Sequence, residues 1–426
     1  MTHHRRRASL SYRHRCRGTA YVLAVGLSLL LAAVATGSLL ASQALMHAGR
    51  DQEDVAKARV LARSGLAWGL AALNRHVAYA GGTVPSTATL SSASGRESLT
   101  ATIANSAPAV GVNEFQPAVI DSTATVGLAQ RRIVGQAIAV TRPYSAFQKA
   151  LAVGKVLTVT SSGTVSIPSG EGIAAQLDVA GGGTVAGDVE QSNAVGNTVK
   201  SAADHAAKLV AFPEASAIDT LIASGTTYII PTGTSAFALS RLLASPRSNP
   251  TGTLNTSGIY VVNCAGRRVS IANCRVAGTL ILLDPGAGSF IGSGIVFEPA
   301  VHGYPTLIVR GNMTFSTTST VLSESSGTNV NFAPQGTPYP FVGGGWDTDT
   351  SDTYTPGIDG MVFVTGDAVV SGRLRTATFV VCGNLTVSGT LITEPDPWCF
   401  VAPAPGFTST TWQLKSGSVS QPLPAP

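Results

Sequence analysis

A short acidic run in the last quarter of the chain combines residue types and spacing that could bind a metal ion. Asp347, Asp349 and Asp352 stand within the nine residues WDTDTSDTY. Carboxylates at near-alternate positions of a loop can surround Ca²⁺, which binds oxygen ligands. The run lacks the Gly and the Glu of the EF-hand loop. Two interpretations therefore remain open, a calcium site and an acidic loop that is solvated.

Residues suited to other chemistry are sparse. Beyond residue 18 the histidines show no HxH or HExxH spacing that would indicate a zinc site. No GxSxG, Walker or GxGxxG element occurs in a strand, turn and helix context. We therefore predict a protein that is not an enzyme and that has no cofactor other than the calcium ion considered above.

The basic character of the chain is confined to its N-terminus. The chain has a formal net charge of +5, yet only 12% of its residues are charged. Six of its 28 Lys and Arg residues lie in residues 1–18, which contain no acid, so the rest of the chain carries 22 basic and 23 acidic residues. A near-neutral body with a basic arm does not indicate a nucleic-acid partner.

An apolar segment follows this arm directly. Thr19 to Met46 run for 28 residues without a charge, and a helix needs about 20 apolar residues to cross a bilayer. The arginines before the segment and the acids after it predict a single-pass anchor in the cell membrane, with a cytoplasmic N-terminus and an extracytoplasmic body. The alternatives are a cleaved signal peptide, with small-residue sites at 33–35 and 42–44, and a buried core helix.

The helix is predicted to continue beyond the membrane. From Val55 to Val77 apolar residues recur at spacings of three or four, which is the pattern of one helical face. Gly81 and Gly82 then interrupt the pattern. The sequence thus predicts one long helix, apolar all round in its first half and amphipathic in its second half.

This region resembles a known family. The stretch RGTAYVLAVGLSLLLAAVATGSLLASQALMHAGRDQEDVAKARVLARSGLAWGLAALNRH (residues 17–76) is similar to the N-terminal region of PilX-like minor pilins and other type IV pilus accessory proteins. The resemblance implies that Gly18 precedes a prepilin-peptidase cut, that Thr19 is the mature N-terminus and that a β-rich head follows. Leu23 stands at the fifth mature position, where pilins usually have Glu.

Four cysteines lie in the part of the chain predicted to be exported, where disulfides persist. They are Cys264, Cys274, Cys382 and Cys399. The shortest connections pair the first with the second and the third with the fourth, and four buried free thiols are the alternative.

The second half of the chain is repetitive. Gly311-Asn, Gly366-Asp and Gly383-Asn each follow an apolar strand and precede a second short strand that ends at Ser or Ser-Gly. Such repeats predict stacked coils around a continuous core, with Gly, Asn or Asp at corners that need a positive φ. We predict a mainly β fold with a right-handed parallel β-helix-like solenoid, which also resembles the β-helical domains of bactofilin-like proteins. An antiparallel β-sandwich is the alternative.

The predicted organisation follows from these patterns. It consists of a basic cytoplasmic arm (1–18), a transmembrane helix (19–46), an amphipathic continuation (47–80), a small β-rich domain (81–150), a β-solenoid (151–395) with a loop insertion (331–356), and a Pro-rich irregular tail (396–426).

These features predict a non-catalytic, membrane-anchored structural or cell-surface protein. Its partners would be the membrane and the subunits of a pilus or surface assembly. The alternative is a polysaccharide-binding or carbohydrate-active surface protein. In that case the aromatic residues of the insertion would stack on sugars, although they could equally pack the loop onto the solenoid: Tyr339, Phe341, Trp346 and Tyr354.

Overall fold

The computed structural model describes most of the 426 residues. The described ranges are 12–75, 87–105, 117–169, 172–175, 178–191, 210–230, 233–325, 329–338 and 345–422. The chain forms two compact units, which are described separately. The first comprises Met1–Val140 with Thr410–Pro426, and the second comprises Thr141–Ser409.

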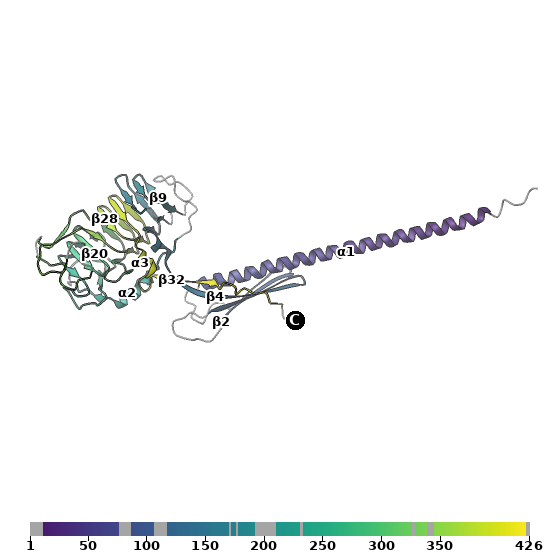
Figure 1. Ribbon diagram of the computed structural model, residues 1–426, viewed down its shortest axis with the longest axis horizontal. Coiled ribbons are helices and arrows are strands. Elements are labelled where there is room, and N and C mark those ends of the chain that lie inside the picture. The colour runs from purple at the N-terminus through teal and green to yellow at the C-terminus, as the bar shows by residue number, and fades with distance from the viewer. Residues whose placement is uncertain are drawn as a thin grey trace, which may run out of the picture. The chain divides into compact units, whose positions relative to one another are not determined.

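One uninterrupted helix, α1 (Tyr12–Arg75), opens the first unit (Figure 1). It is the one helix within the described ranges that is long and apolar enough to cross a membrane, judged by length and composition, and the apolar part of it is exposed. The hydroxyl groups of Ser28, Thr36 and Ser38 donate to carbonyls of the preceding turn, as Ser28 Oγ does to Ala24 O at 2.8 Å. Such side chains need no water to be satisfied, which suits an apolar environment.

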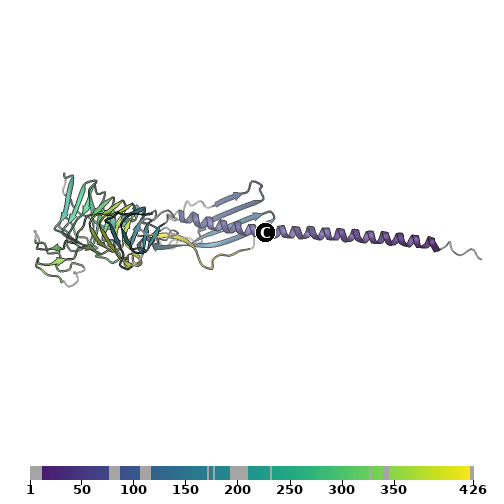
Figure 2. The same ribbon diagram turned by 90° about the horizontal axis from the view of Figure 1, so that it is seen from above.

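The C-terminal half of α1 packs on a five-stranded sheet, and Figure 2 shows these strands running alongside that part of the helix. The sheet order is β1 (Thr87–Ser91), β2 (Glu97–Asn105), β3 (Ala118–Val126), β4 (Ala129–Pro143) and β32 (Thr408–Leu414). Strands β1 to β4 pair antiparallel. Ala62, Leu66 and Leu73 of the helix share a core with Ile120 and Trp412 of the sheet.

Two helical glycines allow this close packing. A Cβ on Gly65 would lie 2.1 Å from Ser122 Oγ, and a Cβ on Gly69 would lie 2.5 Å from a side-chain carbon of Ile120. The face of α1 that packs on the sheet therefore contains two small residues one turn apart, Gly65 and Gly69, in addition to its apolar residues.

The prediction of an irregular C-terminal tail was wrong for residues 397–401 and 408–414. Asp396 caps helix α3 (Pro397–Val401), because its carboxylate accepts a hydrogen bond from Trp398 N at 3.0 Å and Pro397 occupies the first turn. Strand β32 is rich in Thr and buries Trp412 against α1. Pro397 begins α3, where proline is tolerated, and Pro395, Pro403 and Pro405 lie outside both elements.

The second unit is a parallel β-helix-like solenoid with three faces. Face 1 contains, in spatial order, β11 (Val189–Gln191), β8 (Ile173–Ala175), β5 (Leu151–Val153), β29 (Phe379–Val381), β26 (Val362–Val364), β21 (Leu307–Arg310), β18 (Thr279–Leu283), β15 (Ile259–Asn263) and β12 (Thr226–Thr227). Face 2 contains β13 (Ala236–Ser240), β16 (Arg268–Ala272), β19 (Phe290–Ile291), β22 (Met313–Phe315), β27 (Ala368–Val370), β30 (Leu385–Val387), β6 (Val156–Val159) and β9 (Asp178–Gly181). Face 3 contains β10 (Thr184–Ala186), β7 (Thr164–Ser166), β31 (Thr390–Thr393), β28 (Arg373–Thr376), β25 (Gly357–Ile358), β20 (Ile295–Glu298), β17 (Cys274–Ala277) and β14 (Leu243–Ala244).

All recorded pairings on the three faces are parallel, so the solenoid prediction is confirmed and the antiparallel sandwich is excluded.

The coils are not stacked in the order of the sequence. The first coil (β5, β6, β7) lies between the second coil and the last one, with Leu151 in register with Phe379 and Thr164 with Thr390. The chain therefore enters the stack at an interior position, moves to one end, and crosses to the other end at β12. From there it winds back until its last coil meets its first.

The central strands of face 1 are buried on both sides, as are β17 and β20 of face 3. Those of face 1 are continuous apolar runs such as TLILL and FVV, which is typical of parallel strands covered on both sides. The outer side of face 1 packs against η1 (Ser145–Gln148), η2 (Ala215–Ile218), α2 (Asp219–Ser224) and α3, with Phe147 and Phe407 in contact at 5.5 Å between ring centroids.

The repeated Gly-Asn and Gly-Asp corners differ from the prediction in one respect. Gly366 and Gly383 do not have a positive φ; a Cβ on either would lie 2.6 Å from the carbonyl oxygen of the corner glycine in the adjacent coil. Glycine is needed there because backbones approach closely. Gly311, the first of these repeated corners, does have a positive φ of 138°, and so do the corner residues Asn273 (52°) and Asp284 (50°).

The polar residue after each corner glycine links the coils. Asn312 Oδ1 accepts a hydrogen bond from Asp367 N at 2.8 Å, and Asp367 Oδ1 accepts one from Asn384 N at 2.7 Å. This ladder satisfies backbone donors that the turns leave unpaired.

Alanine at a corner glycine should separate two coils. A Cβ on Gly389 would lie 2.0 Å from Gly372 O, whereas a Cβ on Gly182 meets nothing within 4 Å. We expect Gly389→Ala to lower the free energy of unfolding by about 1–3 kcal/mol, as overpacking does, and Gly182→Ala to leave it unchanged or slightly higher. Guanidinium unfolding of the detergent-solubilised chain, followed by far-UV circular dichroism, measures both. Equal effects of the two substitutions would contradict the corner argument.

Candidate functional site on face 3 of the solenoid

A buried ion pair lies on the outer side of face 3. On β17 the side chains of Cys274 and Val276 enter the solenoid core, so Arg275 points outward, and on β20 Glu298 points outward as well. Register places the two as diagonal neighbours, and Arg275 Nε and Nη2 donate to Glu298 Oε2 at 2.9 and 2.8 Å. The Arg275 side chain is fully buried. A buried pair of this kind needs further hydrogen bonds to offset its loss of hydration.

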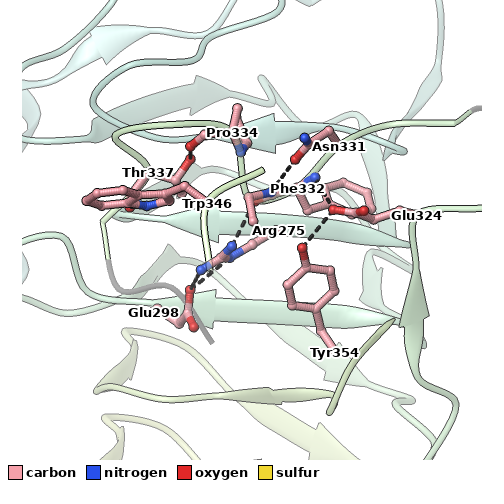
Figure 3. Close-up of polar contacts among 10 residues, drawn as sticks. Arg275, Glu298, Glu324, Asn331, Phe332, Pro334, Thr337, Trp346 and Tyr354 are labelled. Carbon is pink, nitrogen blue, oxygen red and sulfur yellow. Dashed lines mark hydrogen bonds and ion pairs between the residues drawn. The ribbon is translucent and has the colours of Figure 1, made fainter. Parts of the chain in front are cut away.

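The insertion between β22 and β25 supplies those bonds (Figure 3), and it comprises residues 316–356, so it begins earlier than the predicted start at residue 331. Arg275 Nη1 donates to Phe332 O at 2.7 Å, and the guanidinium carbon lies 5.3 Å from the centroid of the Tyr354 ring. The insertion therefore covers the charge of Arg275 with a carbonyl dipole and an aromatic face.

A second buried acid organises the insertion itself. Glu324 is 1% exposed, and its Oε1 accepts hydrogen bonds from Phe332 N at 2.6 Å and from Tyr354 Oη at 2.7 Å. Its Oε2 accepts from Asp352 N at 3.1 Å. This acid holds together the short antiparallel pair β23 (Leu322–Ser323) and β24 (Thr353–Tyr354) and the segment around Phe332.

Burial changes the proton affinity of two groups in this network. It raises the pKa of Glu298, an effect that the charge of Arg275 opposes. It also raises the pKa of the Tyr354 hydroxyl, and the neighbouring Glu324 raises it further. The tyrosine is therefore a hydrogen-bond donor at neutral pH and cannot act as a base.

The apolar part of the same contact buries a small cluster on face 3. The insertion contributes Leu322, Phe332, Ala333 and Tyr354, and the solenoid contributes Leu243 and Val296. Tyr354 is thus a packing residue, and Trp346 is half-exposed with its Nε1 donating to Thr337 O at 2.7 Å. Tyr339 and Phe341 lie outside the described residues.

Each of the three aspartates of the candidate calcium site has other partners, and Asp347 and Asp349 also lie close enough to Asp352 to raise its pKa. Asp347 Oδ1 accepts from Asn331 at 3.1 Å, and Asp349 Oδ1 accepts from the backbone and hydroxyl of Ser351 at 2.9 and 2.7 Å. Asp352 lies beside Glu324, and burial followed by this charge raises its pKa. Within the described ranges no group of three or more His, Cys, Asp or Glu side chains is placed to hold a metal ion. Calcium binding here stays a prediction.

The four cysteines of the body are free thiols in this structure. Cys264 and Cys274 enter the solenoid core, and Cys382 and Cys399 lie in the layer outside face 1. Neither predicted pair is joined. Burial raises the pKa of Cys264 to about 11 and those of Cys274 and Cys382 to about 12, and it raises the pKa of Cys399 as well. Such thiols are protonated and poorly nucleophilic at neutral pH.

Gly18 and Thr19 lie within α1, so the predicted processing site forms part of a continuous helix. Arg275, Glu298 and Glu324 were not among the site residues predicted from the sequence. The available signal was an isolated charge inside an apolar strand, as in CRVA and IVFE, because such a charge must find a partner when the strand is buried.

The fold is thus a β-solenoid and an antiparallel sheet that follow a long apolar N-terminal helix. No protein family and no curated protein matches the chain. Among solved structures it is similar to the competence-associated pilin ComZ from Thermus thermophilus, with 10% identity over 87% of this chain and 98% of that chain and a TM-score of 0.22. A likeness of this size carries no argument about function.

Removing the buried cation should release the insertion. Arg275→Met leaves Glu298 buried without its partner, and we expect a loss of about 3–5 kcal/mol in the free energy of unfolding. The control is Arg310→Met, because Arg310 forms an exposed pair with Asp284 at 3.5 Å, and such pairs contribute about 0–1 kcal/mol. Limited proteolysis should cut Arg275→Met first within the insertion. A further Glu298→Leu substitution should restore part of the stability. Equal resistance of all variants to proteolysis would show that Arg275 does not hold the insertion on face 3.

The thiols should react slowly in the native protein. Because burial raises their pKa values, we expect a maleimide reagent at pH 7.5 to label Cys264, Cys274, Cys382 and Cys399 only after denaturation. Mass spectrometry of the non-reduced, denatured protein counts the labels at each position. Loss of labelling at Cys264 together with Cys274, or at Cys382 together with Cys399, would instead demonstrate the disulfides.

Proposed function

We propose that the chain is a non-catalytic structural protein, anchored in the membrane by one helix and displaying its solenoid on the outer side as part of a pilus-like or cell-surface assembly. The observation that carries the proposal is the division of α1. The apolar first part is exposed, while Ala62, Leu66 and Leu73 in the last third are buried against the sheet.

The exposed half of the helix needs an apolar surrounding. Leu, Val and Met side chains between Tyr21 and Met46 are mostly more than half exposed, and an apolar surface this long is unfavourable in water. A bilayer, or the apolar helices of other subunits, would cover it. The six arginines before it favour a cytoplasmic N-terminus.

The buried charges of the second unit support a structural role. Arg275, Glu298 and Glu324 are each committed to holding the insertion on face 3. The corner ladder of Asn312, Asp367 and Asn384 is likewise committed to joining coils. These polar groups stabilise shape, which is what a displayed head requires.

The first residue of the mature protein tests the proposal. We expect the protein recovered from membrane and sheared surface fractions to begin at Thr19, because the proposed cut follows Gly18, and expect Gly18→Val to accumulate uncut in the membrane. Gly49→Val, farther along the same helix, is the control and should be processed normally. N-terminal sequencing of the membrane, sheared and medium fractions measures this. A chain that begins near Thr36 and is found in the medium would overturn the anchor.

A further inference from the structure

An open hollow of about 220 Å³ lies on the outer side of face 3, between the insertion and β28. Both ends of the insertion form one wall, with Thr318, Ser319 and Val321 from its start and Pro356 from its end. Arg373 and Arg375 of β28 form the other wall.

The two arginines are placed by the alternation of the strand. Leu374 between them is buried in the core, so Arg373 and Arg375 both project outward, about 6.6 Å apart along the strand at about 3.3 Å per residue. Arg373 pairs with no acid among the described residues. Arg375 Nη1 lies 3.8 Å from Asp359 Oδ1, which is a long contact, and both side chains are more than half exposed. Both guanidinium groups are therefore available, since exposed pairs of this length are weak.

The remainder of the lining is uncharged. It offers hydroxyl groups from Thr318 and Ser319 and apolar surface from Val321, which is 49% exposed, and from Pro356. A ligand that matches this lining carries anionic groups for the guanidinium forks, hydroxyl groups for the Ser and Thr side chains, and some C–H surface.

A neighbouring hollow limits where an anion can bind. It has a volume of about 250 Å³, shares Arg375 with the first hollow, and is lined by Asp359, Glu394 and Asp396. Three carboxylates would repel an anionic ligand. The surface that can bind an anion therefore ends at Arg375.

The geometry points to a polysaccharide with carboxylate groups as the ligand of the first hollow. Nucleic acid fits less well, because the lining contains two cations and no aromatic ring, whereas nucleic-acid binding depends on many phosphate contacts and on base stacking. The hydroxyl groups and the two guanidinium groups of the lining match the hydroxyls and carboxylates of an acidic sugar chain. The inference goes beyond the anchoring role, and its test does not depend on whether a filament forms.

Binding of oligogalacturonate to the purified, detergent-solubilised full chain tests the inference. We expect Arg373→Ala and Arg375→Ala each to weaken binding by about tenfold, the loss that corresponds to one charge-assisted hydrogen bond, and the double variant to weaken it further. Arg96→Ala is the matched control, because Arg96 is exposed and belongs to the first unit. Circular dichroism confirms that each variant is folded.

Three results would overturn the inference. The first is that the unaltered chain does not bind oligogalacturonate in isothermal titration calorimetry. The second is that the double variant binds as well as the unaltered chain. The third is that neutral dextran or a single-stranded oligonucleotide binds as tightly as oligogalacturonate and depends equally on Arg373 and Arg375. Selective binding of the acidic chain, lost with the two arginines, supports it.

Discussion

The solenoid depends on how closely one coil can approach the next at its corners. At Gly366, Gly383 and Gly389 the carbonyl oxygen of the adjacent coil occupies the place where a Cβ would stand. Only this approach lets the short strands of all three faces pair at the ordinary strand spacing. Because the three-residue strands contribute few hydrogen bonds each, the continuous core that runs through the stack exists only while every coil remains in contact with its neighbours.

Face 3 shows how a charged pair shapes a surface without reacting. Arg275 and Glu298 interrupt an otherwise apolar strand surface, and their loss of hydration is offset by bonds from the insertion. Once fixed, the insertion stands beside β28, and its two ends form a wall opposite Arg373 and Arg375. The buried contact of Arg275 and Glu298 with the insertion thereby determines the shape of the hollow between the insertion and β28, which is open to solvent.

The local patterns of the sequence were sufficient for the class of fold. The uncharged run from Thr19 to Met46 indicated the helix, and the Gly366 and Gly383 repeats indicated stacked coils. The spatial order of the coils could not be predicted, since the pairing of Leu151 with Phe379 joins segments more than 200 residues apart that differ little from other strands. The role of Arg275 was missed because its partners Phe332 and Tyr354 come from the insertion, which is distant in the sequence. Strand β32 was missed because nearby prolines obscured a short run of Thr and Trp.

The path of the chain gives the second unit two covalent connections to the first. The chain leaves strand β4 to build the whole solenoid and returns in β32, which lies next to β4 in the same sheet. A single proteolytic cut in either connection would therefore leave the solenoid attached through the other. The same arrangement allows the solenoid to be replaced during evolution, because a different domain inserted between β4 and β32 would leave the helix and its sheet intact.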